Sequence, residues 1–304
     1  MYKINLPMKS YKMNLILQLL IFIPFLFQCS EADKKVKSEA IKIEDNSKVP
    51  SLRDTLITIN IANVKCDIAF PDSGSTYRGN ILLLQGFNFP KEDWCKNAPA
   101  LCREAARRGY TMIMPDMGRS VYADTFFAET APIYKNQPLR SALCDSLFPY
   151  LKKNFDILLD EQSNFILGLS SGARGAALIV LEEPNLFSAA GLLSGDYDQT
   201  GIPGDVIMKL YYGNFESNKK RWKEIDNIIT DIDKWKTPVY IGHGKLDKVV
   251  PHAQSKQLND SLKTRLKPNE LIFNEPVMGH DYKYWGSETL PVLNFFDRHN
   301  KNKS

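Results

Sequence analysis

The sequence Gly168-Leu169-Ser170-Ser171-Gly172 constrains the fold of this chain more than any other feature. An apolar run, Phe165–Leu169, leads into it, and an alanine- and leucine-rich stretch, Ser171–Glu182, leads out. A G-x-S-x-G motif between a strand and a helix is typical of a sharp turn that presents a serine hydroxyl. Flanking glycines leave room for that turn, and the helix N-terminus favours negative charge beside the serine. We therefore predict that Ser170 is a catalytic nucleophile.

The alternative for this motif is an ordinary glycine-rich turn between a strand and a helix. A nucleotide-binding loop is disfavoured, because the lysine of a phosphate-binding loop is absent and so is a G-x-G-x-x-G sequence.

From residue 52 onward, strand-like runs alternate with helix-like stretches. The expected strands are 52–61, 64–70, 81–84, 110–114, 165–169, 189–193, 239–241 and 271–273. The expected helices are 98–108, 139–153, 171–182, 252–266 and 289–299. The first two strands are close enough for an antiparallel pair, and strands separated by helices form a parallel sheet. The fold class is therefore α/β, with a mostly parallel central sheet and helices on both faces.

Residues 197–236 interrupt this alternation with a loop containing Gly and Pro and with a lysine-rich helical stretch. An insertion of this kind lies above the carboxyl ends of the strands, where ligands bind in open α/β sheets. We expect it to form a lid or a wall of the binding pocket.

The catalytic base must come from the four histidines of the chain. His280 follows the late strand 271–273, where a histidine that serves Ser170 belongs in chain order. His243 is the rival, and its alternative role is that of a structural histidine hydrogen-bonded beneath the site. The acid should follow the preceding strand, and Asp247 does so in Gly242-His243-Gly244-Lys245-Leu246-Asp247. Asp196 and Asp233 are less well placed.

These residues predict roles in acyl transfer. His280 takes the proton of Ser170 and later gives it to the leaving group, while Asp247 orients the imidazole and stabilises its charged form. The oxyanion requires two backbone N–H donors, which we assign to Ser171 and, in the loop after strand 81–84, to Phe87. No metal or organic cofactor is implied.

The N-terminus resembles an export signal. Lys9 and Lys12 precede a 13-residue apolar run, Leu15–Phe27, which is shorter than a membrane span. Leu26-Phe27-Gln28-Cys29 resembles the lipobox of bacterial lipoproteins, although a small residue is usual where Gln28 stands. We expect a signal peptide over 1–28, a charged tether over 29–50 and a catalytic domain over 51–304. The localisation implied is the cell envelope, periplasm or outer membrane, with a lipid on Cys29; the alternative is a plain signal peptide with an incidental Cys29.

Charge and cysteine content limit the possible partners. Removing the three lysines of residues 1–28 from the 39 basic residues leaves 36 against 35 acidic ones, so the body is nearly neutral and nothing suggests a nucleic-acid partner. Four cysteines remain in the body and allow three full pairings, among which the sequence does not choose: Cys66, Cys95, Cys102 and Cys144.

Several segments together resemble the putative-esterase (esterase D-like) branch of the α/β hydrolases, over roughly residues 78–298. They are 114–124, the turn 168–175, 184–195, 242–247 and Gly279-His280-Asp281-Tyr282 through Trp285. The sequence departs from the branch in Ser171-Gly172-Ala173, where Met-Gly-Gly is common, and in Gln85-Gly86, where His-Gly is common. Neither departure removes a backbone donor. The resemblance implies an α/β-hydrolase fold and a serine esterase.

The substrate is less constrained. Aromatic residues of the loops near the site, Trp94, Tyr122 and Tyr282, are candidates to bind a sugar or a phenolic acyl group, with core packing as the alternative. An exported member of this branch implies deacylation of carbohydrate-linked acetyl or feruloyl esters. The alternatives are a siderophore esterase or acyltransferase on the same triad, and a non-catalytic binding protein on a hydrolase scaffold.

Overall fold

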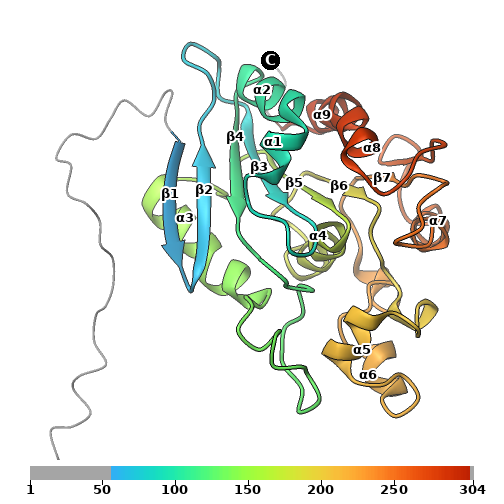
Figure 1. Ribbon diagram of the computed structural model, residues 1–304. Helices are drawn as coiled ribbons and strands as arrows, with labels where there is room; N and C mark the ends of the chain where they lie inside the picture. Colours follow the sequence, from blue (N-terminus) through green and yellow to red (C-terminus); the bar gives the residue numbers. More distant parts are fainter. Residues whose placement is uncertain (1–55, 302–304) are drawn as a thin grey trace, which may run out of the picture. The chain divides into compact units, whose positions relative to one another are not determined.

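A computed structural model describes residues 56–301, which form an eight-stranded sheet in the order β1-β2-β4-β3-β5-β6-β7-β8 (Figure 1). The predicted segments 1–28 and 29–50 lie outside the described residues. The strands are β1 Leu56–Ile61, β2 Val64–Ala69, β3 Gly79–Leu84, β4 Tyr110–Pro115, β5 Asn164–Leu169, β6 Ala189–Leu193, β7 Val239–Gly242 and β8 Leu271–Asn274.

The pairing of the strands decides where a site can form. β1 and β2 are antiparallel, and β2 joins β4 in an antiparallel pair. Every pair from β4 through β3, β5, β6 and β7 to β8 is parallel. The carboxyl ends of six strands therefore meet at one edge, and the loops that leave them form a common surface.

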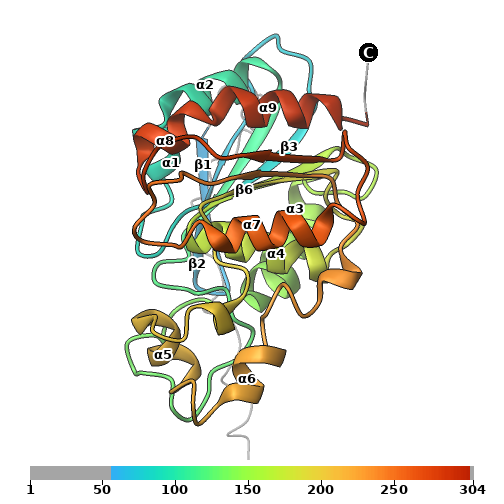
Figure 2. The same ribbon diagram turned by 90° about the vertical axis from the view of Figure 1, so that its right-hand side faces the viewer.

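Helices cover both faces of the sheet (Figure 2). One face carries α1 Asp93–Asn97, α2 Pro99–Arg107, α8 Tyr282–Ser287 and α9 Thr289–Arg298. The other carries the π-helical turn Ala142–Leu147, which continues into α3 Phe148–Phe155, together with α4 Ser171–Glu182 and α7 Ala253–Leu262. The central strands are buried on both sides, which explains why β3 and β5 read as continuous apolar runs rather than as alternating patterns.

Successive side chains of β3 enter opposite cores. Ile81 and Leu83 pack into the core beneath α2 and α9, whereas Leu82 and Leu84 pack into the core beneath α3, α4 and α7. This alternation follows from the two-residue period of a strand and fixes the register of β3 against both layers.

The insertion predicted over 197–236 contains α5 Val206–Tyr212 and α6 Lys219–Glu224, between the short 3-10 turns Gln199–Gly201 and Ile232–Lys234. Figures 1 and 2 show α5 and α6 beside the sheet layers rather than on either of them. Their side chains have a small core of their own, shared with the loop after β4: Val121, Ala123, Tyr134, Met208, Tyr211, Tyr212 and Trp222.

The predicted α/β fold and the antiparallel opening pair are confirmed. Strand and helix limits differ from the expected ones by few residues, and α4 and β6 coincide with them. Helices α1 and α8 were not predicted, because they have five and six residues and lack the several turns that make an apolar face visible in a sequence.

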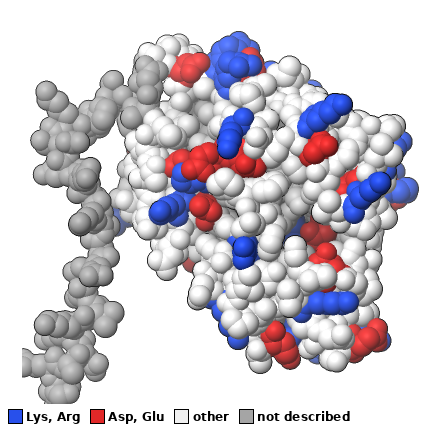
Figure 3. All heavy atoms as spheres, viewed as in Figure 1, with Lys and Arg blue, Asp and Glu red and all other residues white. Residues whose placement is uncertain are grey.

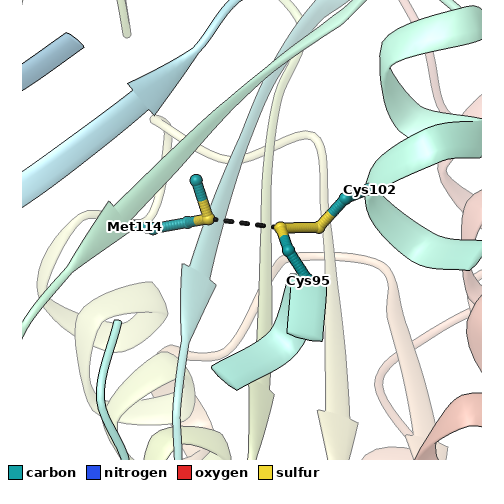
Figure 4. Close-up of a disulfide and its surroundings, with 3 residues drawn as sticks. All are labelled: Cys95, Cys102 and Met114. Atoms are coloured by element: carbon teal, nitrogen blue, oxygen red, sulfur yellow. Dashed lines mark hydrogen bonds between the residues drawn. A yellow bond between two sulfur atoms is a disulfide. The ribbon is translucent and has the colours of Figure 1, made fainter. Parts of the chain in front are cut away.

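Cys95 in α1 and Cys102 in α2 form a disulfide, and Met114 of β4 lies against it with its Sδ 3.6 Å from the Cys95 Sγ (Figure 4). Cys66 and Cys144 are buried free thiols. Burial raises the pKa of the Cys66 thiol to about 12, so this thiol is protonated and unreactive at neutral pH. Of the cysteine pairings among which the sequence does not choose, the structure contains one disulfide, between two cysteines close in sequence.

Reduction of this disulfide is expected to lower the free energy of unfolding by about 2–3 kcal/mol, because a cross-link across 7 residues restricts the unfolded chain. Urea denaturation followed by tryptophan fluorescence, with and without dithiothreitol, measures the change. The matched control is the Cys95→Ser/Cys102→Ser double variant, which dithiothreitol should leave unaffected. An unchanged wild-type midpoint in dithiothreitol would contradict a stabilising bridge.

The face of the molecule seen in Figure 3 carries both acidic and basic side chains, and its elongated acidic group has basic side chains directly beside it. This agrees with the near-balance of charge in the sequence. Within residues 56–301, none of the helices combines the length and the apolar character that a bilayer crossing requires.

Candidate active site

Ser170 occupies the turn between β5 and α4. Its backbone has φ 53° and ψ −125°, a conformation that residues other than glycine rarely adopt. Its N–H donates to the carbonyl of Leu193 on β6 at 2.8 Å, which holds the turn against the sheet. A Cβ atom at Gly168 would overlap the carbonyl of Gly172, and one at Gly172 would overlap that of Leu84. No residue with a Cβ atom therefore fits at either of these two glycines of the motif.

Ser170, His280 and Asp247 form a continuous hydrogen-bonded chain. The Nε2 of His280 lies 3.0 Å from the Ser170 Oγ, and its Nδ1 lies 2.6 Å from the Asp247 Oδ2. His280 stands between β8 and α8, and Asp247 follows β7, so the three side chains come from the carboxyl ends of three strands. The Trp285 ring packs edge to face against the His280 imidazole, with 5.0 Å between the ring centroids, and this contact limits rotation of the imidazole.

The loops that carry the acid and the histidine are joined by backbone hydrogen bonds. Lys245 N–H donates to the carbonyl of Pro276 at 2.8 Å, and Leu246 N–H donates to that of Met278 at 2.9 Å. A Cβ at Gly244 would overlap the Met278 carbonyl, so only glycine permits this approach. The separation between Asp247 and His280 is thereby fixed by the main chain rather than by side chains alone.

The Asp247 carboxylate is fully buried yet well supplied with donors. Its Oδ1 accepts the N–H groups of Val249 and Val250 at 2.8 and 2.9 Å. Burial disfavours the charge, but hydrogen bonds from His243 and His280 outweigh that effect and hold the pKa of Asp247 well below its usual range. The carboxylate is consequently ionised at neutral pH and can stabilise an imidazolium.

His243 lies beneath the site, as its structural alternative predicted. Its Nε2 is 3.2 Å from the Asp247 Oδ2 and 3.0 Å from the Val250 carbonyl, and both neighbours can only accept. We therefore place the proton on Nε2, while Nδ1 accepts from the Ser255 hydroxyl at 2.7 Å. His243 is thus a second hydrogen-bonding support of the acid, at the same Oδ2 that His280 contacts.

Ser171 and Phe87, the two predicted oxyanion donors, both line the cavity beside Ser170. Ser171 is the first residue of α4, whose leading N–H groups lack partners within the helix. Within the described part of the chain, neither N–H donates to another backbone carbonyl across a turn or loop. The role of these two N–H groups as oxyanion donors stays a prediction.

Comparison with known proteins assigns the chain to a family. The model of the family described as putative esterase matches residues 64–295. The chain belongs to this esterase family. The predicted family, the α/β-hydrolase fold and the assignment as a serine esterase are confirmed. No curated protein matches the chain in sequence.

Solved structures share the fold of this esterase at low identity. An S-formylglutathione hydrolase from Staphylococcus aureus superposes with a TM-score of 0.61 at 19% identity, covering 80% of this chain and 98% of that one. One from Agrobacterium tumefaciens gives 0.62 at 14% identity, covering 81% and 94%. A ferulic acid esterase gives 0.58 at 18% identity, covering 81% and 97%.

A cavity of about 410 Å³ opens beside Ser170 of the esterase. Its lining is mainly apolar. It comes from the loops after β3, β4 and β6, the turn between β5 and α4, the insertion and the acid loop. The lining residues are Phe87, Val121, Ser170, Ser171, Asp196, Gly201, Ile202, Pro203, Gly204, Asp205, Ile207, Met208, Val249, Val250 and Pro251. The insertion forms one wall, as expected from the sequence. Its individual residues were not predicted, because 197–236 carries no motif that identifies them.

The three aromatic side chains predicted to bind substrate are absent from this lining, and the structure corrects that assignment. Trp94 is 1% exposed, and its indole N–H donates to the Leu84 carbonyl at 3.1 Å. Tyr122 is also 1% exposed, and its ring lies so close to Gly175 of α4 that a Cβ there would overlap it. Tyr282 is half-buried between Trp94 and Trp285. Core packing, the alternative given above, describes their contacts.

The rival acids have other partners. Asp196 lines the cavity and pairs with the buried Arg174 at 3.0 Å, whereas Asp233 pairs with Arg265. Neither is hydrogen-bonded to His280. Among residues 56–301 there is also no group of three or more His, Cys, Asp or Glu side chains placed to hold a metal ion.

Proposed function

We propose that this esterase hydrolyses carboxylic esters through an acyl-enzyme on Ser170. The observation that carries the proposal is the hydrogen-bonded chain Ser170–His280–Asp247, with distances of 3.0 and 2.6 Å. Geometry of this kind defines a serine triad independently of the order of its residues in the chain.

The steps follow from the geometry. The Ser170 Oγ attacks the ester carbonyl carbon while its proton passes to the His280 Nε2. The N–H groups of Ser171 and Phe87 stabilise the resulting oxyanion. The bond from carbonyl carbon to alcohol oxygen then breaks, and His280 protonates the alcohol. A water molecule attacks the acyl-enzyme by the same route, its proton passing through His280 back to Ser170, so that ester and water give acid and alcohol.

The proposed substrates are acyl groups, acetyl or feruloyl, linked to carbohydrate outside the cell. The mainly apolar cavity of about 410 Å³ suits a planar aromatic acyl group better than acetyl, which would leave most of it empty. The ferulic acid esterase among the solved structures supports the same choice.

The proposed location is the cell envelope, with a signal peptide over 1–28 and a lipid on Cys29. The apolar run before Cys29 and the Cys95–Cys102 disulfide support export, because disulfides persist in oxidising compartments.

An ester panel tests the proposed substrate class: methyl ferulate, acetylated xylan, and p-nitrophenyl acetate and butyrate, with acid and alcohol products quantified. We expect methyl ferulate to give a higher kcat/KM than any acetyl ester. Equal rates across the panel would reject the feruloyl assignment. Ester products formed with an added alcohol would instead indicate the acyltransferase alternative. Failure of the folded protein to react with a fluorophosphonate probe would favour the binding-protein alternative.

A further inference from the structure

Two acidic residues and no lysine, arginine or histidine belong to the lining of the cavity beside Ser170. Asp196 and Asp205 both belong to its lining, and the other lining residues are apolar, glycine, proline or the two serines at the turn. Lys209, Lys248 and His252 adjoin lining residues in the sequence and are not part of the lining. A charged group of a substrate that enters the cavity therefore meets negative charge from the protein.

The negative charge of Asp196 is largely neutralised by the buried guanidinium of Arg174. Its Oδ2 accepts a hydrogen bond from the NH1 of Arg174 at 3.0 Å, and the guanidinium is fully buried. The guanidinium of Arg174 is thus turned away from solvent, and protein groups accept its hydrogen bonds. The second acid of the lining, Asp205, has no basic side chain as an ion-pair partner among the described residues.

Asp205 is held in place by the fold. It is the N-cap of α5, and its Oδ1 accepts the N–H of Met208 at 2.8 Å. No Lys, Arg or His nitrogen of the described residues lies within 4.0 Å of its carboxylate. The charge of Asp205 also acts on Asp196, since burial first and this neighbouring carboxylate next raise the pKa of Asp196. The two acids therefore share one electrostatic environment.

We propose that Asp205 makes this cavity select uncharged or cationic ester substrates and reject anionic ones. The inference rests on the proposed function, because it concerns the same Ser170 site. Two unit charges several ångströms apart at a partly buried surface interact strongly enough to change a rate constant by roughly tenfold or more. An apolar wall with one fixed carboxylate suits a substrate whose apolar part carries an ammonium group or a hydroxyl donor.

The test uses esters of equal shape and different charge. On the acyl side these are the p-nitrophenyl esters of 4-(trimethylammonio)butanoate, 5,5-dimethylhexanoate and 4-sulfobutanoate. On the alcohol side they are choline butyrate, 3,3-dimethylbutyl butyrate and 2-sulfoethyl butyrate. We expect the kcat/KM of the cation to exceed that of the anion by about tenfold or more in one series. The series that shows the ratio identifies the half of the ester that occupies the cavity.

Two variants assign the effect to its residue. Asp205→Asn keeps a capping side chain on α5 and removes the charge, so the cation-to-anion ratio should fall several-fold. Asp145→Asn removes one negative charge at an exposed position outside the cavity and should leave the ratio unchanged. A ratio near one in both wild-type series, or an Asp205→Asn ratio equal to that of the wild type, would overturn the inference.

A binding measurement separates this failure from failure of the proposed function. Absence of hydrolysis of the neutral esters would reject the proposed function. Calorimetric titration of the full chain with the N-methyl amides of the three acyl-side acids and with the N-alkyl butyramides that match the three alcohols then decides the inference without turnover. Tighter binding of a cationic amide than of the matching anionic one supports the selectivity, and equal or inverted affinities reject it.

Discussion

Replacing Ser170 with alanine is expected to lower kcat for ester hydrolysis by about 10⁴-fold or more while the protein stays folded. The hydroxyl is the atom that would attack the ester carbonyl, and its hydrogen bond goes to the His280 Nε2 at 3.0 Å. Without it, catalysis falls to the contribution of substrate binding and of the backbone donors. Alanine fits the turn without any new contact, because it only removes the oxygen. Hydrolysis of p-nitrophenyl butyrate, with circular dichroism as the check on folding, measures the effect.

Ser188→Ala is the matched control for this variant. Ser188 precedes β6 at the end of the sheet away from the site, where its N–H donates to the Asn164 carbonyl. Its buried hydroxyl has no hydrogen-bond partner among the described residues, so its loss should change neither activity nor stability measurably. A folded Ser170→Ala enzyme with activity near that of the wild type would show that another group is the nucleophile.

Replacing Arg174 with methionine is expected to lower the free energy of unfolding by about 3–5 kcal/mol. The Arg174 guanidinium is fully buried and donates to four acceptors: the Asp196 carboxylate at 3.0 Å, the Gln199 amide at 2.7 Å, the Tyr212 hydroxyl at 3.3 Å and the Asp226 carbonyl at 2.6 Å. Methionine fills much of the same volume but leaves Asp196 buried without its counter-ion. The large effect thus comes from the stranded carboxylate rather than from a cavity. Urea denaturation gives the difference.

Two further variants separate the causes. Arg107→Met removes an arginine of which 63% of the side chain is exposed and which pairs with Glu104, so it should change stability by about 0.5 kcal/mol or less. Adding Asp196→Asn to Arg174→Met removes the stranded charge and should restore part of the lost stability. A single Arg174→Met variant within about 1 kcal/mol of the wild type would mean that water or neighbouring groups compensate the Asp196 charge.

The parts of the site that the sequence predicts are those encoded locally. Ser170 sits in a motif whose glycines are dictated by the nearby carbonyls of Gly172 and Leu84, so a few residues carry the information. His280 and Asp247 follow from chain order, since each lies in the loop that follows a strand of the parallel part of the sheet. Their hydrogen-bonded separation additionally depends on the close approach of Gly244 to Met278, which no sequence pattern announces.

The parts that could not be predicted depend on the direction of side chains in loops. Trp94 belongs to the short helix α1, which the sequence did not reveal, and its indole N–H donates to the Leu84 carbonyl in the core. Tyr122 belongs to the loop after β4, and its ring lies against Gly175. Loops have no fixed period that would reveal which way a side chain points. The cavity instead uses Ile202, Met208 and their neighbours in the insertion. That wall depends on contacts between distant segments, so composition alone does not identify it.

Two buried arginines hydrogen-bond to the insertion, and this affects the entropy cost of ligand binding. Arg174 of α4 reaches Tyr212 of α5 and the carbonyl of Asp226, while Arg140 donates to the Asp226 carboxylate at 2.9 Å. The wall beside Ser170 is therefore ordered when the protein folds, before any substrate arrives. A pre-organised site spares the ligand the conformational entropy of ordering a loop, so affinity and association rate reflect shape and charge rather than closure.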